Sequence, residues 1–160
     1  MKQRSAAYPS YTIQESLDFA ERIYKVYGNS YRATREEIAT ALNYSVGSLT
    51  QKVSAAVQYG LLDLKSKEGY KVTDLFVKWY RPISDNAKRE ALQEAFKSPP
   101  LYSDLITVCE GNILPPLKPL ANILLQKHNI SEKACDKAAE IFEQNADLVS
   151  ALTKDRLLVF

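Results

Sequence analysis

Residues 45–70 read SVGSLTQKVSAAVQYGLLDLKSKEGY, and in this stretch a helical pattern gives way to an alternating one. Apolar residues at helical spacing predict an amphipathic helix over residues 46–59. Gly60 ends it, because glycine adopts a positive φ without a steric penalty. A small basic hairpin is expected to follow at once, with a strand from Leu61 to Leu64, a turn at residues 67–69 and a return strand at residues 70–72.

Two further helices precede this stretch. Thr34 and Glu37 have the spacing of a capping box, which predicts a helix over residues 35–42 and a turn at Asn43 and Tyr44. Thr12 and Glu15 form the same pattern ahead of a first helix that closes at Gly28. Residues 12–82 are therefore expected to form two helices, a turn, a third helix and a hairpin.

The rest of the chain shows only helical patterns. The starts or breaks of successive helices are marked by serine and proline, at Ser84, Pro99, Pro100, Pro119 and Ser131. The sequence therefore predicts a mainly α fold with one small β-hairpin, followed by an all-helical C-terminal half. We place a domain boundary between residues 1–82 and residues 83–160, and expect the second part to serve packing, dimerisation or partner docking. The apolar residues 157–160 are expected to dock on that second half or on a neighbouring subunit.

Composition limits the possible classes of protein. The chain has 160 residues, of which 46% are hydrophobic and 25% charged, as in ordinary globular proteins. No apolar run reaches the roughly 18–20 residues that a membrane-spanning helix needs, and the N-terminal residues do not resemble a signal peptide. Cys109 and Cys135 are far apart, so we expect reduced cysteines and a cytoplasmic location.

The sequence contains no recognisable catalytic or metal-binding pattern. His128 is the only histidine and follows a helical segment, where a C-terminal capping role is expected. No phosphate-binding glycine loop is present, and the two cysteines lack the spacing of a zinc site. We therefore expect a protein without enzyme activity, cofactor or metal.

Residues 12–82 resemble the winged helix-turn-helix superfamily of DNA-binding proteins. The resemblance rests on Ser45, which stands where such proteins cap the recognition helix, and on Gly60-Leu61-Leu62 at the entry to the wing. The whole chain also resembles a set of bacterial proteins that share its Tyr8-Pro9, its QYGL at residues 58–61 and its PPLY at residues 99–102. This second resemblance implies a fold and no activity.

The winged-helix resemblance implies that helix 46–59 enters the major groove of duplex DNA and that the wing, residues 63–71, contacts the backbone. Residues 1–82 carry 12 Lys and Arg against 8 Asp and Glu, a net charge of +4, whereas residues 83–160 have a net charge of −2. This asymmetry agrees with a phosphate-facing first half. The expected base contacts are Ser48, Thr50, Gln51 and Ser54, and the expected phosphate contacts are Arg32, Arg35, Lys52, Lys65, Lys67 and Lys71, with the hydroxyls of Tyr44 and Tyr70.

An alternative interpretation is a winged-helix adaptor that holds a protein partner and binds no DNA. It is suggested by helix 46–59, which has no arginine and only one lysine, although arginine is the commonest residue that reads guanine. The interpretation that the resemblance favours is a small bacterial DNA-binding protein. It would be a transcriptional regulator that forms a homo-oligomer or binds a protein partner through residues 83–160. A third is an accessory domain of an enzyme whose catalytic chain lies elsewhere.

Overall fold

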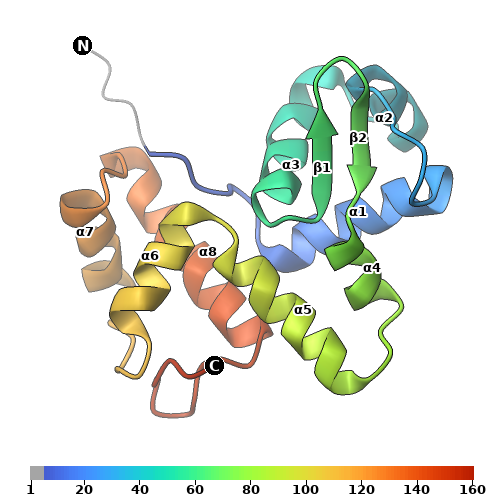
Figure 1. Cartoon of the computed structure of the whole chain (residues 1–160). Coiled ribbons are helices and arrows are strands. Elements are labelled where there is room, and N and C mark those ends of the chain that lie inside the picture. The colour runs from blue at the N-terminus through green and yellow to red at the C-terminus, as the bar shows by residue number, and fades with distance from the viewer. Residues whose placement is uncertain (1–5) are drawn as a thin grey trace.

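The computed structural model describes residues 6–160 and contains, in this part of the chain, eight helices and one two-stranded antiparallel sheet (Figure 1). The prediction of a mainly helical fold with one small hairpin is confirmed. The elements are α1 (Ile13–Tyr27), α2 (Arg35–Leu42), α3 (Val46–Gln58), β1 (Leu62–Lys65), β2 (Gly69–Val72), α4 (Asp74–Tyr80), α5 (Asp85–Lys97), α6 (Pro100–Cys109), α7 (Leu117–Lys127) and α8 (Glu132–Leu148).

The first two helices begin at the predicted capping boxes. In α1 the Thr12 hydroxyl accepts the backbone N–H of Glu15 (3.2 Å), and the Glu15 carboxylate accepts that of Thr12 (3.1 Å). Thr34 and Glu37 repeat both bonds at the start of α2. Each box satisfies backbone donors that a helix leaves without partners at its N-terminus, so these boundaries follow from local sequence.

Gly60 ends α3 and turns the chain toward β1. Its φ is 76°, and its N–H donates to the carbonyl of Val57 (2.9 Å) while that of Leu61 donates to the carbonyl of Ala56 (2.9 Å). This pair of bonds is a Schellman motif, which closes a helix and reverses the chain direction. The hairpin therefore starts at a position fixed by α3.

The hairpin is clamped from a third segment. Ala33 and Tyr70 exchange both backbone hydrogen bonds, each 2.8 Å long, so β2 has β1 on one side and residue 33 on the other. The sequence placed Gly69 in the turn, but Gly69 belongs to β2, and Lys67 (φ 69°) takes the left-handed turn conformation. A Cβ on Gly69 would lie 2.3 Å from the carbonyl oxygen of Ala33, so this residue allows the close approach.

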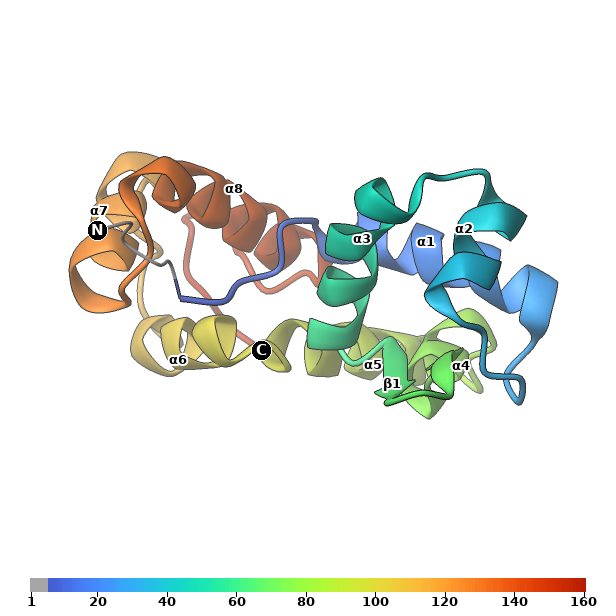
Figure 2. The same cartoon turned by 90° about the horizontal axis from the view of Figure 1, so that it is seen from above.

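The two halves of the chain share one hydrophobic core. Buried side chains from α1 and α3 and from α6, α7 and α8 belong to a single cluster. Figure 2 shows α6 and α5 along one long side of the molecule and α8 and α1 along the other. Within residues 6–160, no helix has both the length and the apolar character needed to span a membrane.

A buried hydrogen-bond network joins the halves inside this core. The Asn145 side chain of α8 is fully buried; its Oδ1 accepts the N–H of Ile13 (2.8 Å) and its Nδ2 donates to the hydroxyl of Tyr59 (2.8 Å). That hydroxyl donates in turn to the carbonyl of Tyr11 (2.7 Å). The network thus connects the start of α1, the end of α3 and the last turn of α8.

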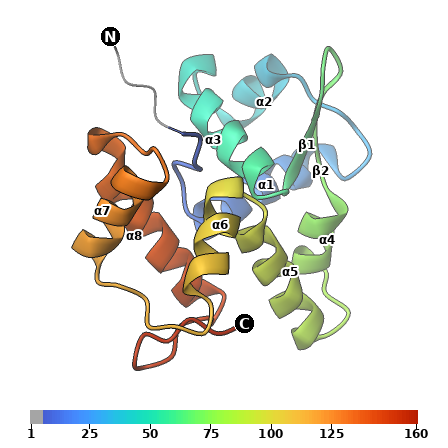
Figure 3. The same cartoon turned by 60° about the vertical axis from the view of Figure 1, so that its left-hand side comes forward.

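The C-terminal segment corrects the prediction of an all-helical second half. After α8 the chain folds back and forms isolated β-bridges between Ile113 and Leu157 and between Leu152 and Leu158. Leu158 is fully buried, and Phe160 lies against Phe96 of α5 with ring centroids 6.1 Å apart. Figure 3 shows the C-terminal segment folding back after α8. The expected docking of residues 157–160 is confirmed, and the surface they use is their own second half.

We predict that Asn145→Ala lowers the free energy of unfolding by about 2–4 kcal/mol, because it leaves the buried N–H of Ile13 without its acceptor and removes the donor to the buried Tyr59 hydroxyl. Chemical denaturation measures this, with exposed Gln144→Ala as the control. The double variant Asn145→Ala/Tyr59→Phe should lose less free energy of unfolding than the sum of the losses in the two single variants. Additive effects would show that Asn145 and Tyr59 are not coupled.

We also predict that deleting residues 157–160 lowers the free energy of unfolding by at least about 2 kcal/mol, since burial of a leucine side chain alone is worth about 1.5–3 kcal/mol. Lys154→Ala, an exposed change in the same segment, should have an effect within about 0.5 kcal/mol. A truncated chain that unfolds at the wild-type denaturant concentration would contradict this prediction.

Candidate nucleic-acid interface

The outer face of α3 presents polar side chains to solvent. Ser48, Thr50, Gln51 and Ser54 are all exposed. Three of them already use a polar atom locally: the Ser48 hydroxyl donates to the carbonyl of Ser45, that of Thr50 to the carbonyl of Val46, and that of Ser54 accepts the amide of Gln58. The Gln51 side chain makes no hydrogen bond within residues 6–160, so the carbonyl oxygen and the amino group of its amide are both available to a ligand.

A cleft separates α3 from the hairpin. It consists of two adjoining hollows of about 440 and 240 Å³, and Arg35, Leu64 and Tyr70 line both. The structure brings five of the residues predicted from sequence to this cleft, namely Arg35, Thr50, Ser54, Lys67 and Tyr70. The N-terminal end of α2, the outer side of α3 and the hairpin therefore face one concave surface.

Arg35 and Tyr70 act as a pair in this cleft. Nη2 of Arg35 donates to the Tyr70 hydroxyl (3.2 Å), and this bond raises the pKa of the guanidinium above its usual value. Tyr70 is only 5% exposed, and its backbone lies between β1 and residue 33. Its hydroxyl holds Arg35 at the surface of the cleft, and Arg35 carries the charge there.

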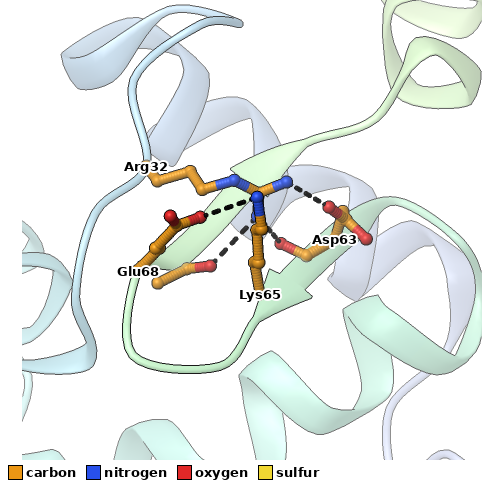
Figure 4. Close-up of polar contacts among 5 residues, drawn as sticks. Arg32, Asp63, Lys65 and Glu68 are labelled. Atoms are coloured by element: carbon orange, nitrogen blue, oxygen red, sulfur yellow. Dashed lines mark hydrogen bonds and ion pairs between the residues drawn. The ribbon is translucent and has the colours of Figure 1, made fainter.

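Two predicted phosphate contacts are already paired with acids (Figure 4). Arg32 forms an ion pair with Asp63 and donates to the carbonyl of Gly69 (3.2 Å). Lys65 lies 3.2 Å from the carboxylate of Glu68 across the turn. Arg32 therefore ties the segment before α2 to the hairpin, and the charge of Lys65 is partly neutralised. Sequence reasoning missed both acids as partners; only the Lys65–Glu68 spacing around the turn could have signalled one of them.

Lys52 lies apart from the cleft, between two aromatic rings. Its ammonium is 4.5 Å from the ring centroid of Tyr11 and 5.3 Å from that of Tyr44. The guanidinium of Arg22 lies over the same Tyr44 ring and donates to its hydroxyl (2.6 Å). These contacts attach α3 to α1 and to the N-terminal segment. Arg22, which the sequence did not single out, adds a second cation to this side of α3.

Lys67 and Lys71 are the predicted wing cations that form no ion pair within the described chain. Lys67 is exposed at the tip of the turn, and Lys71 is half-buried on β2. Glu36 lines the same hollow as Lys67 and Arg35, so the cleft carries both signs of charge. The free positive charge is therefore concentrated at the tip of the hairpin and at Arg35.

The described residues hold no group of His, Cys, Asp or Glu side chains that could bind a metal ion. His128 stands at the C-cap of α7, where its N–H donates to the carbonyl of Leu124, as the sequence predicted. Cys109 and Cys135 are both buried and unbridged.

Comparison of the chain with protein-family models, with curated proteins and with solved structures gives no match. Its function must therefore be inferred from the surface formed by α2, α3 and the hairpin.

Proposed function

We propose that this chain is a non-enzymatic winged helix-turn-helix protein that binds duplex DNA with α3 and with the wing, residues 63–71, as a transcriptional regulator does. The observation that carries the proposal is the outer face of α3, where Ser48, Thr50, Gln51 and Ser54 are exposed and where Thr50 and Ser54 line the cleft beside the hairpin. A helix that reads DNA must present polar side chains from its N-terminal part to the major groove. Gln51 suits adenine, whose N6 and N7 atoms an amide contacts together.

Rigid placement of α3 and the hairpin supports the same proposal. Asn43, with a φ of 60°, ends α2 in the left-handed conformation, and Ser45 starts α3 two residues later. The hairpin is attached to α3 through the Gly60 motif and to the segment before α2 through Ala33 and Arg32. Side chains on a fixed scaffold reach base edges and phosphates without a large ordering cost.

The charge pattern predicts modest affinity with a shallow salt dependence. Arg35, Lys67 and Lys71 supply positive charge near α3 and on the wing, whereas Arg32 and Lys65 are paired with acids. Each phosphate that a protein neutralises on duplex DNA contributes about −0.9 to the slope of log affinity against log salt concentration. We therefore expect a slope of about −3 per chain.

A protein partner is the second candidate, and one observation favours it. Val46 and Leu64, which are 43% and 50% exposed, both line the cleft. Exposed apolar side chains that flank a concave surface are typical of sites that bind another polypeptide. An adaptor would use this cleft without requiring contact with phosphates.

Binding of the full chain to random-sequence duplex DNA across a salt series separates the two candidates. Fluorescence anisotropy should show binding at about 50 mM salt that weakens linearly on logarithmic axes. Absence of binding at that salt concentration would contradict the DNA proposal and leave the adaptor as the better account of α3 and its cleft.

We predict that Lys67→Ala weakens binding to all duplexes similarly and reduces the salt slope by about one, because Lys67 has no acidic partner. Lys65→Ala should change the slope less, since Glu68 already neutralises that charge. Lys137→Ala, an exposed change on α8, is the control. If Lys65 and Lys137 variants reduce the slope as much as the Lys67 variant, the hairpin tip is not the contact.

We predict that Gln51→Ala reduces the preference at one base pair by about 1–3 kcal/mol and leaves thermal stability nearly unchanged, because the side chain is exposed. Selection of preferred sequences from a random duplex library, run for wild type and variant, measures this. Gln126→Ala on α7 is the matched control. An unchanged base preference together with a large fall in melting temperature would assign Gln51 a structural role instead.

A further inference from the structure

A groove of about 470 Å³ lies between α4 and α5, beside the connection that joins them. Val77, Ala87 and Ala91 contribute apolar surface to it. Ile83, in the connection, also lines the groove and is 97% exposed, more than any other large hydrophobic side chain of the described residues. Transfer of such a side chain from water to a covering apolar surface is favourable, so a large exposed one indicates a candidate contact site.

The two sides of the groove carry opposite charges. Lys78 and Arg81 line it from α4 and from the residue that follows α4, and Glu90 and Glu94 line it from α5. None of these four side chains forms an ion pair within residues 6–160. Arg81 lies over the ring of Tyr80, and Glu90 accepts a hydrogen bond from the Asn86 amide. Each row of charge is therefore available to an external partner of opposite sign.

We propose that this groove binds a second copy of the chain across a two-fold axis parallel to the groove. Rotation about such an axis places the basic side of each copy against the acidic side of the other, and it brings the two Ile83 side chains together at the same end. An axis across the groove would instead oppose like charges. Charge complementarity of the surface with itself therefore selects both the occupant and its orientation.

The expected dimer is weak. Stable interfaces bury about 1,200–2,000 Å² in total, and an interface made chiefly by one helix pair and one apolar side chain lies at or below the lower end of that range. We expect a dissociation constant of about 10⁻⁶ to 10⁻⁴ M. Each copy contributes one α3 and one hairpin, so the dimer carries two such units. Formation of the dimer does not depend on DNA binding.

Sedimentation equilibrium of the full chain without DNA tests the proposal. The wild-type protein should associate to a dimer as its concentration rises, and Ile83→Asp should weaken association at least about tenfold. Val108→Asp, a change at another exposed apolar residue on α6, is the matched control and should dimerise normally. A wild-type chain that stays monomeric at concentrations up to about 10⁻⁴ M overturns the proposal. An Ile83→Asp chain that dimerises as wild type does also overturns it, and neither result bears on the DNA proposal.

A charge exchange tests the orientation. Lys78→Glu and Glu90→Lys should each weaken self-association, because each places like charges opposite one another in the homodimer. An equimolar mixture of the two variants should dimerise as wild type does, since every contact between copies again joins opposite charges. Circular dichroism checks that both variants fold. A mixture that associates no better than the separate variants overturns the proposed two-fold arrangement.

Discussion

The hydrogen bonds of Asn145 hold the two halves of the molecule together and determine where α3 ends in space. Its amide group accepts from the start of α1 and donates to Tyr59, the residue that closes α3. Burial raises the pKa of the Tyr59 hydroxyl, so this group keeps its proton and can donate to Tyr11. Because unmet hydrogen-bonding groups are costly in a core, these three elements have one favourable arrangement.

This anchoring gives α3 two different ends. Its C-terminal end is buried against α1 and α8. Its first residues, Val46 to Ser48, are exposed, and Val46 lines the cleft with residues of α2 and the hairpin. The C-terminal half therefore supports the surface that we propose for DNA, although none of its residues lines the cleft. A disturbance of the core near Asn145 should reach α3 through Tyr59.

Ion pairs and contacts with aromatic rings reduce the positive charge that residues 1–82 can offer to a ligand. Arg32 and Lys52 attach segments to one another, through Asp63 and through two tyrosine rings, and Glu68 partly neutralises Lys65 within the hairpin. The charge left for a ligand lies at Arg35, Lys67 and Lys71. A count of lysines and arginines thus overstates the electrostatic attraction of this surface for a polyanion.

Local sequence specifies the helix starts at Thr12, Thr34 and Ser45 and the helix end at Gly60, because each depends on hydrogen bonds between residues a few positions apart. The twelve side chains expected to contact DNA follow from residue type and position, and neither of these specifies a side chain's partner. Packing between distant segments brings Arg32 to Asp63, Gly69 to Ala33, Lys52 between two tyrosines and Asn145 to Tyr59. Apart from the contact of Lys52 with Tyr44, these contacts join residues 31 to 86 positions apart. No local pattern specifies a partner that only the packing of helices brings near.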